Sequence, residues 1–310
     1  MKNEIAIKLV DEVASALVGK RDAAELSVIA LLAGGHLLLE DVPGVGKTTL
    51  ALALAAASGC SFGRIQFTPD TMPSDVFGVS IYDGASGEFK YKPGVIMKNV
   101  ILADEINRTP PKTQSALLEA MEEHQVTVDG VSYPVPEPFF VVATQNPVEH
   151  NGTYPLPEAQ LDRFMMKLSI GYPEQGDEEA MIARAVEGKA NKAPSAVVTP
   201  DALTEMQREV RCVAVCSEVV SYIVSLVKLT RENDELILGA SPRAAIALTN
   251  AAQAAAYVAG REYVTPDDVK KVWEPVMTHR VIASAKARSS GHDAAWIVKR
   301  IKGMAPVPML

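Results

Sequence analysis

The chain carries a short glycine-containing segment whose residue types suit it to bind a triphosphate. The segment Glu40–Thr49 follows the apolar run Leu37–Leu39 and precedes an alanine- and leucine-rich helical pattern at 49–57. This is the strand, loop and helix order of a phosphate-binding loop, in which backbone N–H groups and the helix N-terminus favour anionic oxygens. Lys47 can reach the β- and γ-phosphates, and the hydroxyl of Thr48 can ligate Mg²⁺.

The loop departs from the strict phosphate-loop pattern at its first position. That pattern asks for a glycine four residues before Val45, and this chain has Asp41 there. Aspartate adopts left-handed backbone angles more readily than most residues, so the turn can still form. Taken alone, the segment could instead be a glycine turn that opens a buried helix.

A pair of carboxylates stands at the end of a second apolar run. Residues 100–103 are Val, Ile, Leu and Ala, and they lead directly into Asp104 and Glu105. A continuous apolar run of this kind indicates a buried parallel strand. Beside a phosphate loop, Asp104 could hold the water shell of Mg²⁺, and Glu105 could orient or deprotonate the attacking water. The alternative is a strand whose polar end meets solvent.

The composition is that of an ordinary globular protein. The chain has 310 residues, of which 48% are hydrophobic and 22% charged, and its formal net charge is −8. An acidic balance disfavours a general nucleic-acid binder. No segment has the apolar length of a membrane span, and residues 1–4 lack the apolar core of a signal peptide. We therefore expect a cytoplasmic protein, and the three cysteines suit a reducing compartment.

Apolar spacing and turn signals predict the elements of the first part of the chain. Helical spacing appears over 4–18 and 23–32. Turn residues indicate hairpins near 78–95 and 126–136, the second with Asp129 and Gly130 at its tip. Further strands are expected over 64–67 and 139–143.

The composition changes near residue 173. We predict that 1–173 is an α/β layer with a parallel sheet and that 174–310 is a helical domain. Residues 286–310 carry no interpretable pattern. Helices in the second part are expected at 177–188, 200–210, 217–231, 242–259 and 266–273.

Several ordered segments resemble the MoxR family of AAA+ ATPases. They are Asp104–Arg108, Leu117–Glu123, Ala143–Pro147 and Gly152–Phe164, and the resemblance covers residues 4–285. It implies an α/β fold, with a P-loop AAA+ core whose parallel five-stranded sheet is flanked by helices, followed by a C-terminal all-α lid. The two hairpins resemble the inserts of this family, which move with the nucleotide state in related machines.

The resemblance also implies roles for polar residues. Asn146 is similar to sensor 1, Arg163 to the arginine finger that reaches the neighbouring subunit's nucleotide, and Arg243 to sensor 2. By the residues alone, Asn146 could be a turn residue, Arg163 could pair with Asp162 or Glu158, and Arg243 could simply begin a helix. With Glu105, these three are the expected catalytic residues.

Further residues are assigned by the same resemblance. Gln66 is a candidate switch that holds Glu105 away from water, and Arg108 could face a subunit boundary. The expected ligands of Mg²⁺ are Thr48 and Asp104. The residues expected to bind ATP are Val18, Gly19, Pro43, Gly44, Val45, Gly46, Lys47, Thr48, Thr49 and Asp104.

Three functions are compatible with these motifs. The favoured one is an ATPase that forms a homo-hexamer and remodels, assembles or activates a protein complex or metalloenzyme, with a separate von Willebrand factor A domain protein as the partner that the resemblance implies. The second is a nucleotide-dependent binding switch with little turnover, which would not need Glu105. The third is a magnesium-chelatase-like or DNA-associated motor. The acidic composition disfavours it, and the hairpin tip at Asp129–Gly130 offers DNA no cationic group.

Overall fold

A central parallel sheet organises the first part of the chain. The computed structural model describes residues 2–147, 152–187 and 194–308. The sheet has five strands in the order β2-β5-β8-β1-β9, all paired in parallel. This confirms the predicted sheet. The strands are β2 (Phe62–Gln66), β5 (Val100–Asp104), β8 (Phe140–Gln145), β1 (Leu37–Glu40) and β9 (Met166–Leu168).

The parallel pairing decides where the polar motifs meet. Because parallel strands end at the same edge of a sheet, the segments that follow β1, β5 and β8 lie next to one another. The register places Glu40 beside Gln145 and Gln66 beside Asp104. The phosphate loop, the two carboxylates and Asn146 are therefore neighbours in space although they are far apart in the sequence.

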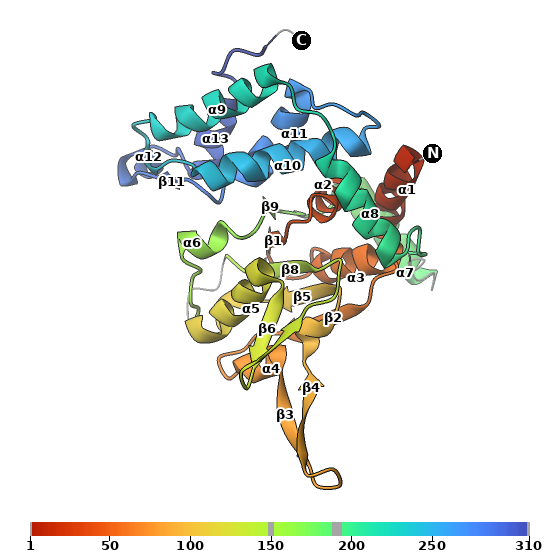
Figure 1. The fold of residues 1–310 in the computed structure, drawn as a ribbon. Helices are drawn as coiled ribbons and strands as arrows, with labels where there is room; N and C mark the ends of the chain where they lie inside the picture. Colours follow the sequence, from red (N-terminus) through yellow and green to blue (C-terminus); the bar gives the residue numbers. More distant parts are fainter. Residues whose placement is uncertain (1, 148–151, 188–193, 309–310) are drawn as a thin grey trace.

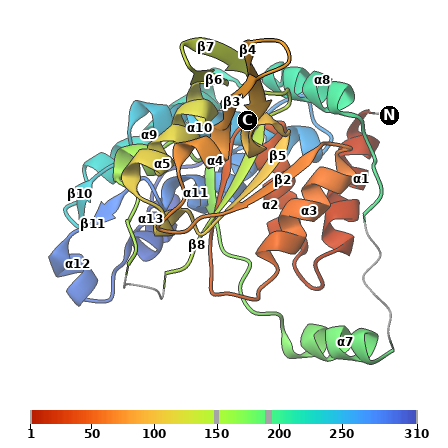
Figure 2. The ribbon, with the colours of Figure 1, turned by 90° about the horizontal axis from the view of Figure 1, so that it is seen from below.

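Alternating side chains of the central strands pack on two opposite layers of helices. Leu37 and Leu39 of β1 belong to a buried cluster with α1 (Lys2–Ser15), α2 (Arg21–Leu32) and α3 (Lys47–Ala57), whereas Leu38 packs with α4 (Pro73–Phe77) and α5 (Pro111–Glu123). Figure 2 shows these helix groups on either side of the strands. The two-residue period of a strand explains the division.

Both predicted hairpins are present. β3 (Gly78–Asp83) pairs with β4 (Glu88–Pro93), and β6 (Gln125–Val128) pairs with β7 (Val131–Pro134). Asp129 and Gly130 form the β6–β7 tip with φ of 51° and 81°, the left-handed angles that an Asp-Gly turn requires. The β3–β4 hairpin projects from the end of the molecule opposite the helical part (Figure 1).

The second part of the chain is helical, as predicted. Most of its helices lie on the side of the sheet away from the β3–β4 hairpin (Figure 1). They are α7 (Gln175–Val186), α8 (Pro200–Arg211), α9 (Ser217–Arg231), α10 (Pro242–Val258), α11 (Pro266–Met277), α12 (Ala285–Ser289) and α13 (Ala294–Lys302). Residue 188, the expected end of the first of these helices, lies outside the described residues.

Two features of the helical part were not anticipated. A short antiparallel pair, β10 (Leu236–Leu238) and β11 (Ile282–Ala283), lies among the helices. Helices α12 and α13 lie where the sequence shows no interpretable pattern. The nine residues of α13 make too few turns to show an apolar period. Its place is set by tertiary contact: the indole Nε1 of Trp273 donates to the Val298 carbonyl at 2.8 Å.

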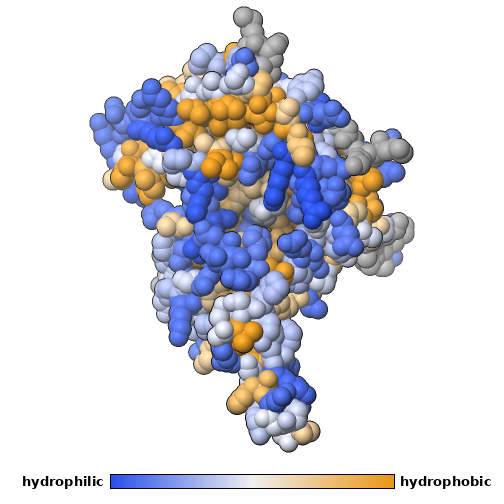
Figure 3. All heavy atoms as spheres, viewed as in Figure 1, coloured by the Kyte–Doolittle hydropathy of each residue, from blue (hydrophilic) through white to orange (hydrophobic). Residues whose placement is uncertain are grey.

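Apolar surface lies towards one end of the molecule, and the middle of the molecule is mainly hydrophilic (Figure 3). The exposed apolar side chains Val220 and Val224 belong to α9, and Figure 3 shows apolar surface gathered over the helical part. The surface between the helical part and the sheet is mainly hydrophilic in the same view. Among the described residues, no helix is long and apolar enough to cross a membrane. The domain boundary near residue 173 stays a prediction, and one buried cluster contains residues from both sides of it, among them Leu37 and Trp273.

A buried histidine makes the stability of the fold depend on pH. His36 directly precedes β1, and its ring lies between two backbone groups. Its Nε2 donates to the Met121 carbonyl at 3.2 Å, and its Nδ1 accepts from the Val141 N–H at 3.1 Å, an arrangement that requires the neutral ring. Burial lowers the pKa of His36 from 6.5 to about 4.

We expect the free energy of unfolding to fall as the pH is lowered from 6.5 towards 4. In that window the unfolded chain binds a proton that folded His36 does not, so acid favours unfolding. Between pH 7 and pH 5 the contribution of His36 amounts to about 2 kcal/mol. Urea unfolding of wild-type and His36→Gln protein at both pH values measures it, since the other titrating groups cancel. An equal pH dependence in the two proteins would contradict the assignment.

Candidate active site

The phosphate loop runs from the end of β1 into α3. Gly44 and Gly46 have φ of 87° and 98°, and Gly46 is the residue immediately before the helix. A side chain in this left-handed region would be strained, so these two positions favour glycine. Val45, between them, packs against the core instead of facing the pocket. The loop therefore leads directly into the N-terminus of α3, the end of a helix that favours anions.

Asp41 has a structural role that its sequence position did not reveal. It does not adopt a left-handed backbone. Its buried carboxylate accepts hydrogen bonds from the Ser169 hydroxyl at 2.7 Å and from the Ile170 N–H at 2.5 Å, with Gly171 N–H at 3.2 Å. The side chain thus ties the beginning of the loop to the segment after β9. The ammonium group of Lys47 donates to the Asp41 carbonyl at 2.6 Å, which keeps it at the loop.

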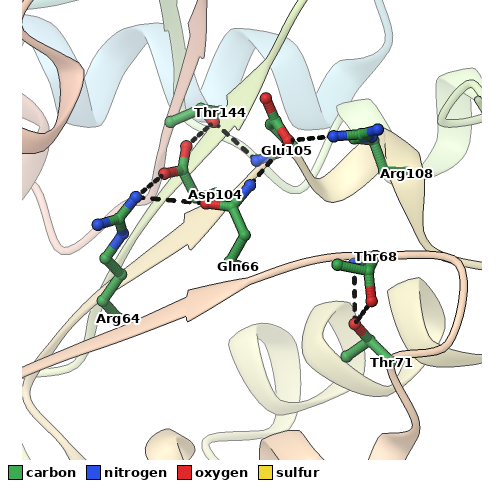
Figure 4. Close-up of polar contacts among 8 residues, drawn as sticks. All are labelled: Arg64, Gln66, Thr68, Thr71, Asp104, Glu105, Arg108 and Thr144. Carbon is green, nitrogen blue, oxygen red and sulfur yellow. Dashed lines mark hydrogen bonds and ion pairs between the residues drawn. The ribbon is translucent and has the colours of Figure 1, made fainter.

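The two carboxylates lie at the end of β5 and share one threonine (Figure 4). The Thr144 hydroxyl donates to Asp104 Oδ1 at 2.7 Å and accepts from the Glu105 N–H at 2.8 Å. Asp104 is buried and also pairs with Arg64 of β2 at 2.8 Å. The backbone of Glu105 is left-handed, with φ of 57°, an uncommon angle for glutamate. The hydrogen bond from its N–H helps to hold this angle.

The Glu105 side chain is held by two donors on one oxygen. Its Oε2 accepts from Gln66 Nε2 at 2.7 Å and from Arg108 Nη1 at 3.0 Å (Figure 4). Gln66 is therefore in contact with the carboxylate that sequence analysis suggested it could restrain. Arg64 also contacts Gln66, at 3.3 Å, so a single polar network joins β2 to the end of β5.

The loop and the carboxylates line one pocket of about 400 Å³. This volume is in the range of small-molecule sites. The Thr48 hydroxyl and the Asp104 carboxylate are hard oxygen donors of the kind that Mg²⁺ takes together with phosphate oxygens. The residues present thus fit a magnesium nucleotide. The lining comprises Pro43, Gly44, Gly46, Lys47, Thr48, Thr49, Arg64, Gln66, Asp104 and Glu105.

Two other segments that carry predicted residues lie beside this pocket. Asn146 is buried directly after β8, where the Asp41 N–H donates to the Gln145 carbonyl at 3.3 Å. The segment that contains Val18 and Gly19 follows α1, and a side chain at Gly46 would come within 3.3 Å of the adjacent Leu17. The structure therefore brings both segments to the phosphate loop.

Arg163 and Arg243 lie together, away from this pocket. Arg163 Nε is 3.0 Å from Glu122 Oε2, and Arg243 Nη2 is 2.9 Å from Glu122 Oε1. All three residues line a second pocket of about 430 Å³. By the sequence alone Asp162 or Glu158 could have paired with Arg163, but the ion pair is with Glu122. The expected catalytic residues thus fall into two groups within the chain.

The segment that carries Arg163 is fixed to the helical part by Arg280. This buried guanidinium donates from Nε to Asp162 Oδ1 at 2.6 Å and from Nη2 to the Phe164 carbonyl at 2.7 Å. The neighbouring His279 donates to the same carbonyl at 2.9 Å. A buried charge that is paired and bonded in this way is costly to disturb. The backbone next to Arg163 is therefore bonded to the segment that directly follows α11 (Pro266–Met277).

Several residues that organise the site were not predicted from the sequence. Arg64 could have been noticed, because residues two apart on a strand share a face, and Arg64 stands two before Gln66. Thr144 directly follows an apolar run, as Asp104 does. The sequence offers no comparable signal for Glu122 or Arg280, whose partners lie in other elements.

Comparisons with known proteins agree with the fold. A family model described as the ATPase family associated with various cellular activities (AAA) matches residues 36–166, and a model described as the AAA lid domain matches 228–301. Chaperone MoxR1 of Mycobacterium tuberculosis is 39% identical over 96% of this chain and 81% of its own. The uncharacterized protein YeaC of Bacillus subtilis is 51% identical over 97% of this chain and 94% of its own.

A solved structure has the same fold. A candidate ATPase from Cytophaga hutchinsonii superposes with a TM-score of 0.90 at 39% identity, covering 99% of this chain and 96% of its own. The five-stranded parallel sheet, the phosphate loop and the helical lid define an AAA+ ATPase fold. The chain belongs to the MoxR family of these proteins.

Proposed function

We propose that this protein binds ATP with Mg²⁺ and hydrolyses it to ADP and phosphate. The observation that carries the proposal is the single pocket that joins Lys47 and Thr48 to Asp104 and Glu105. Lys47 and the loop N–H groups bind the phosphates, and Thr48 and Asp104 hold the cation. When bound, Mg²⁺ neutralises charge on the phosphate oxygens. Val18 and Gly19 lie on the adenine side.

In this proposal Glu105 accepts the proton of the attacking water. Asn146 is positioned by β8 to orient that water or the γ-phosphate. Gln66 and Arg108 restrain the carboxylate, so hydrolysis requires that Glu105 exchange these bonds for one to water. The same restraint favours the second candidate function, a nucleotide-dependent switch with little turnover.

We infer that the arginines serve the neighbouring subunit. Arg163 and Arg243 pair with Glu122 in a pocket separate from their own phosphate loop, which supports a site completed between subunits. Closed symmetric rings satisfy such head-to-tail contacts, and we propose a homo-hexamer. The action is chaperone-like: ATP turnover shifts the lid and the hairpins to remodel a client protein complex or metalloenzyme, together with a separate von Willebrand factor A domain protein, in the cytoplasm.

Lys47→Ala should abolish measurable ATP binding and hydrolysis, because it removes the positive charge that the loop offers to the β- and γ-phosphates. Calorimetry with ATP and a phosphate-release assay measure both effects. Lys112→Ala, an exposed lysine on α5, is the matched control and should behave as wild type. Unchanged ATP affinity in the Lys47 variant would rule out the proposed pocket.

A further inference from the structure

Glu122 connects the two arginines through different atoms. It stands near the end of α5, Arg163 comes from the segment after α6 (Glu158–Leu161), and Arg243 comes from the first turn of α10. The carboxylate uses one oxygen for each guanidinium, at 3.0 Å and 2.9 Å. A core helix, a core loop and the lid therefore meet on a single side chain.

The atoms that bind Glu122 leave much of each guanidinium for another acceptor. Arg163 is held through Nε, so its two terminal amino groups are not used by this bond. Arg243 is held through Nη2 alone, and its side chain is 60% exposed. A guanidinium carries five N–H donors in a rigid fork, so fixing one edge orients the others.

The charges around this second pocket favour an anion. Its lining includes three guanidinium groups, of Arg163, Arg243 and Arg280, against two carboxylates, of Glu122 and Asp162. His36 also lines it, but its lowered pKa keeps the ring neutral near pH 7. The pocket is thus locally cationic in a protein whose net charge is −8.

We propose that Glu122 is a positioning residue for hydrolysis in the adjacent subunit. It holds Arg163 and Arg243 side by side, so that their remaining amino groups face a terminal phosphate of the neighbour's nucleotide. The inference rests on the proposed function, since it presupposes that these arginines act between subunits. A carboxylate that merely joins core and lid would make the same two contacts, and the test must separate these roles.

The test uses mixed rings in which each subunit type is inactive alone. An acceptor, Arg163→Ala, keeps Glu105 but lacks the arginine, and a donor, Glu105→Gln, supplies the arginine. Glu122→Gln keeps the side-chain shape and removes the charge, and it is added either to the donor or to the acceptor. Glu123→Gln in the donor is the matched control, because this exposed neighbour undergoes the same charge change.

We expect the recovered turnover to fall only when Glu122→Gln is in the donor subunit. Glu122→Gln in the donor should lower the recovered turnover about tenfold or more, since small displacements of a catalytic group are costly. The same change in the acceptor, or Glu123→Gln in the donor, should alter it by less than about twofold. ATP affinity and the amount of mixed ring, measured by calorimetry and light scattering, should be the same in all mixtures.

Other results have definite meanings. Turnover could fall equally whether Glu122→Gln is in the donor or in the acceptor, or the amount of mixed ring could drop. Either result assigns Glu122 a structural role and overturns the inference, while the proposed ATPase activity stands. Full recovery with the Glu122→Gln donor overturns it as well. If the mixture of Arg163→Ala and Glu105→Gln subunits without a Glu122 change recovers no turnover, Arg163 does not act between subunits. The inference about Glu122 is then wrong as well.

Discussion

Arg163→Ala should lower ATP turnover by about a thousandfold or more, because an arginine finger stabilises the charge that develops on the transferred phosphoryl group. ATP affinity should change little, since Arg163 lies outside its own subunit's phosphate pocket. Phosphate release and calorimetry separate the two effects. Arg288→Ala, an exposed arginine of α12, removes the same charge and should leave turnover near that of wild type.

The mixing experiment decides whether this arginine acts between subunits. Glu105 remains intact in the Arg163→Ala subunit, so a Glu105→Gln neighbour can supply the missing guanidinium. Turnover should reappear at intermediate ratios of the two inactive proteins. Robust mixed rings without recovered hydrolysis at any ratio would leave Arg163 as a structural partner of Glu122.

Glu105→Gln should retain ATP affinity and slow turnover by roughly a hundredfold or more, the usual effect of removing a positioned proton acceptor. Glutamine has nearly the same shape, and its amide oxygen can still accept from Gln66 and Arg108, so the network in Figure 4 should persist. Binding is measured by calorimetry and turnover by phosphate release under saturating ATP.

A rate near that of wild type would show that Glu105 is not the base, and the binding-switch function would then gain. Glu119→Gln, an exposed carboxylate on α5, is a control for the loss of one negative charge. If the prediction holds, the Glu105→Gln protein retains ATP and can be used to capture the client complex that the active protein releases.

Much of this protein was predictable from short stretches of sequence. The phosphate loop, the strand before Asp104 and the helices of the lid all show local signals: special turn residues, an apolar run and a helical period. The β6–β7 tip at Asp129–Gly130 is a further case, because a tight hairpin turn restricts two adjacent residues. These features depend on contacts within a few residues, so the order of residues alone was enough.

Only the tertiary structure decided how these parts pair. Arg64 and Asp104 are 40 residues apart, and Arg280 and Asp162 are 118 apart, yet each pair forms a close ion pair. The sequence contains many carboxylates that could have taken these roles, and their choice depends on strand order and helix packing. For the same reason the sequence did not show that the Asp41 carboxylate binds the segment after β9. The separation of the site into a phosphate pocket and an arginine pair on Glu122 follows from where the lid rests on the core, which no local pattern encodes.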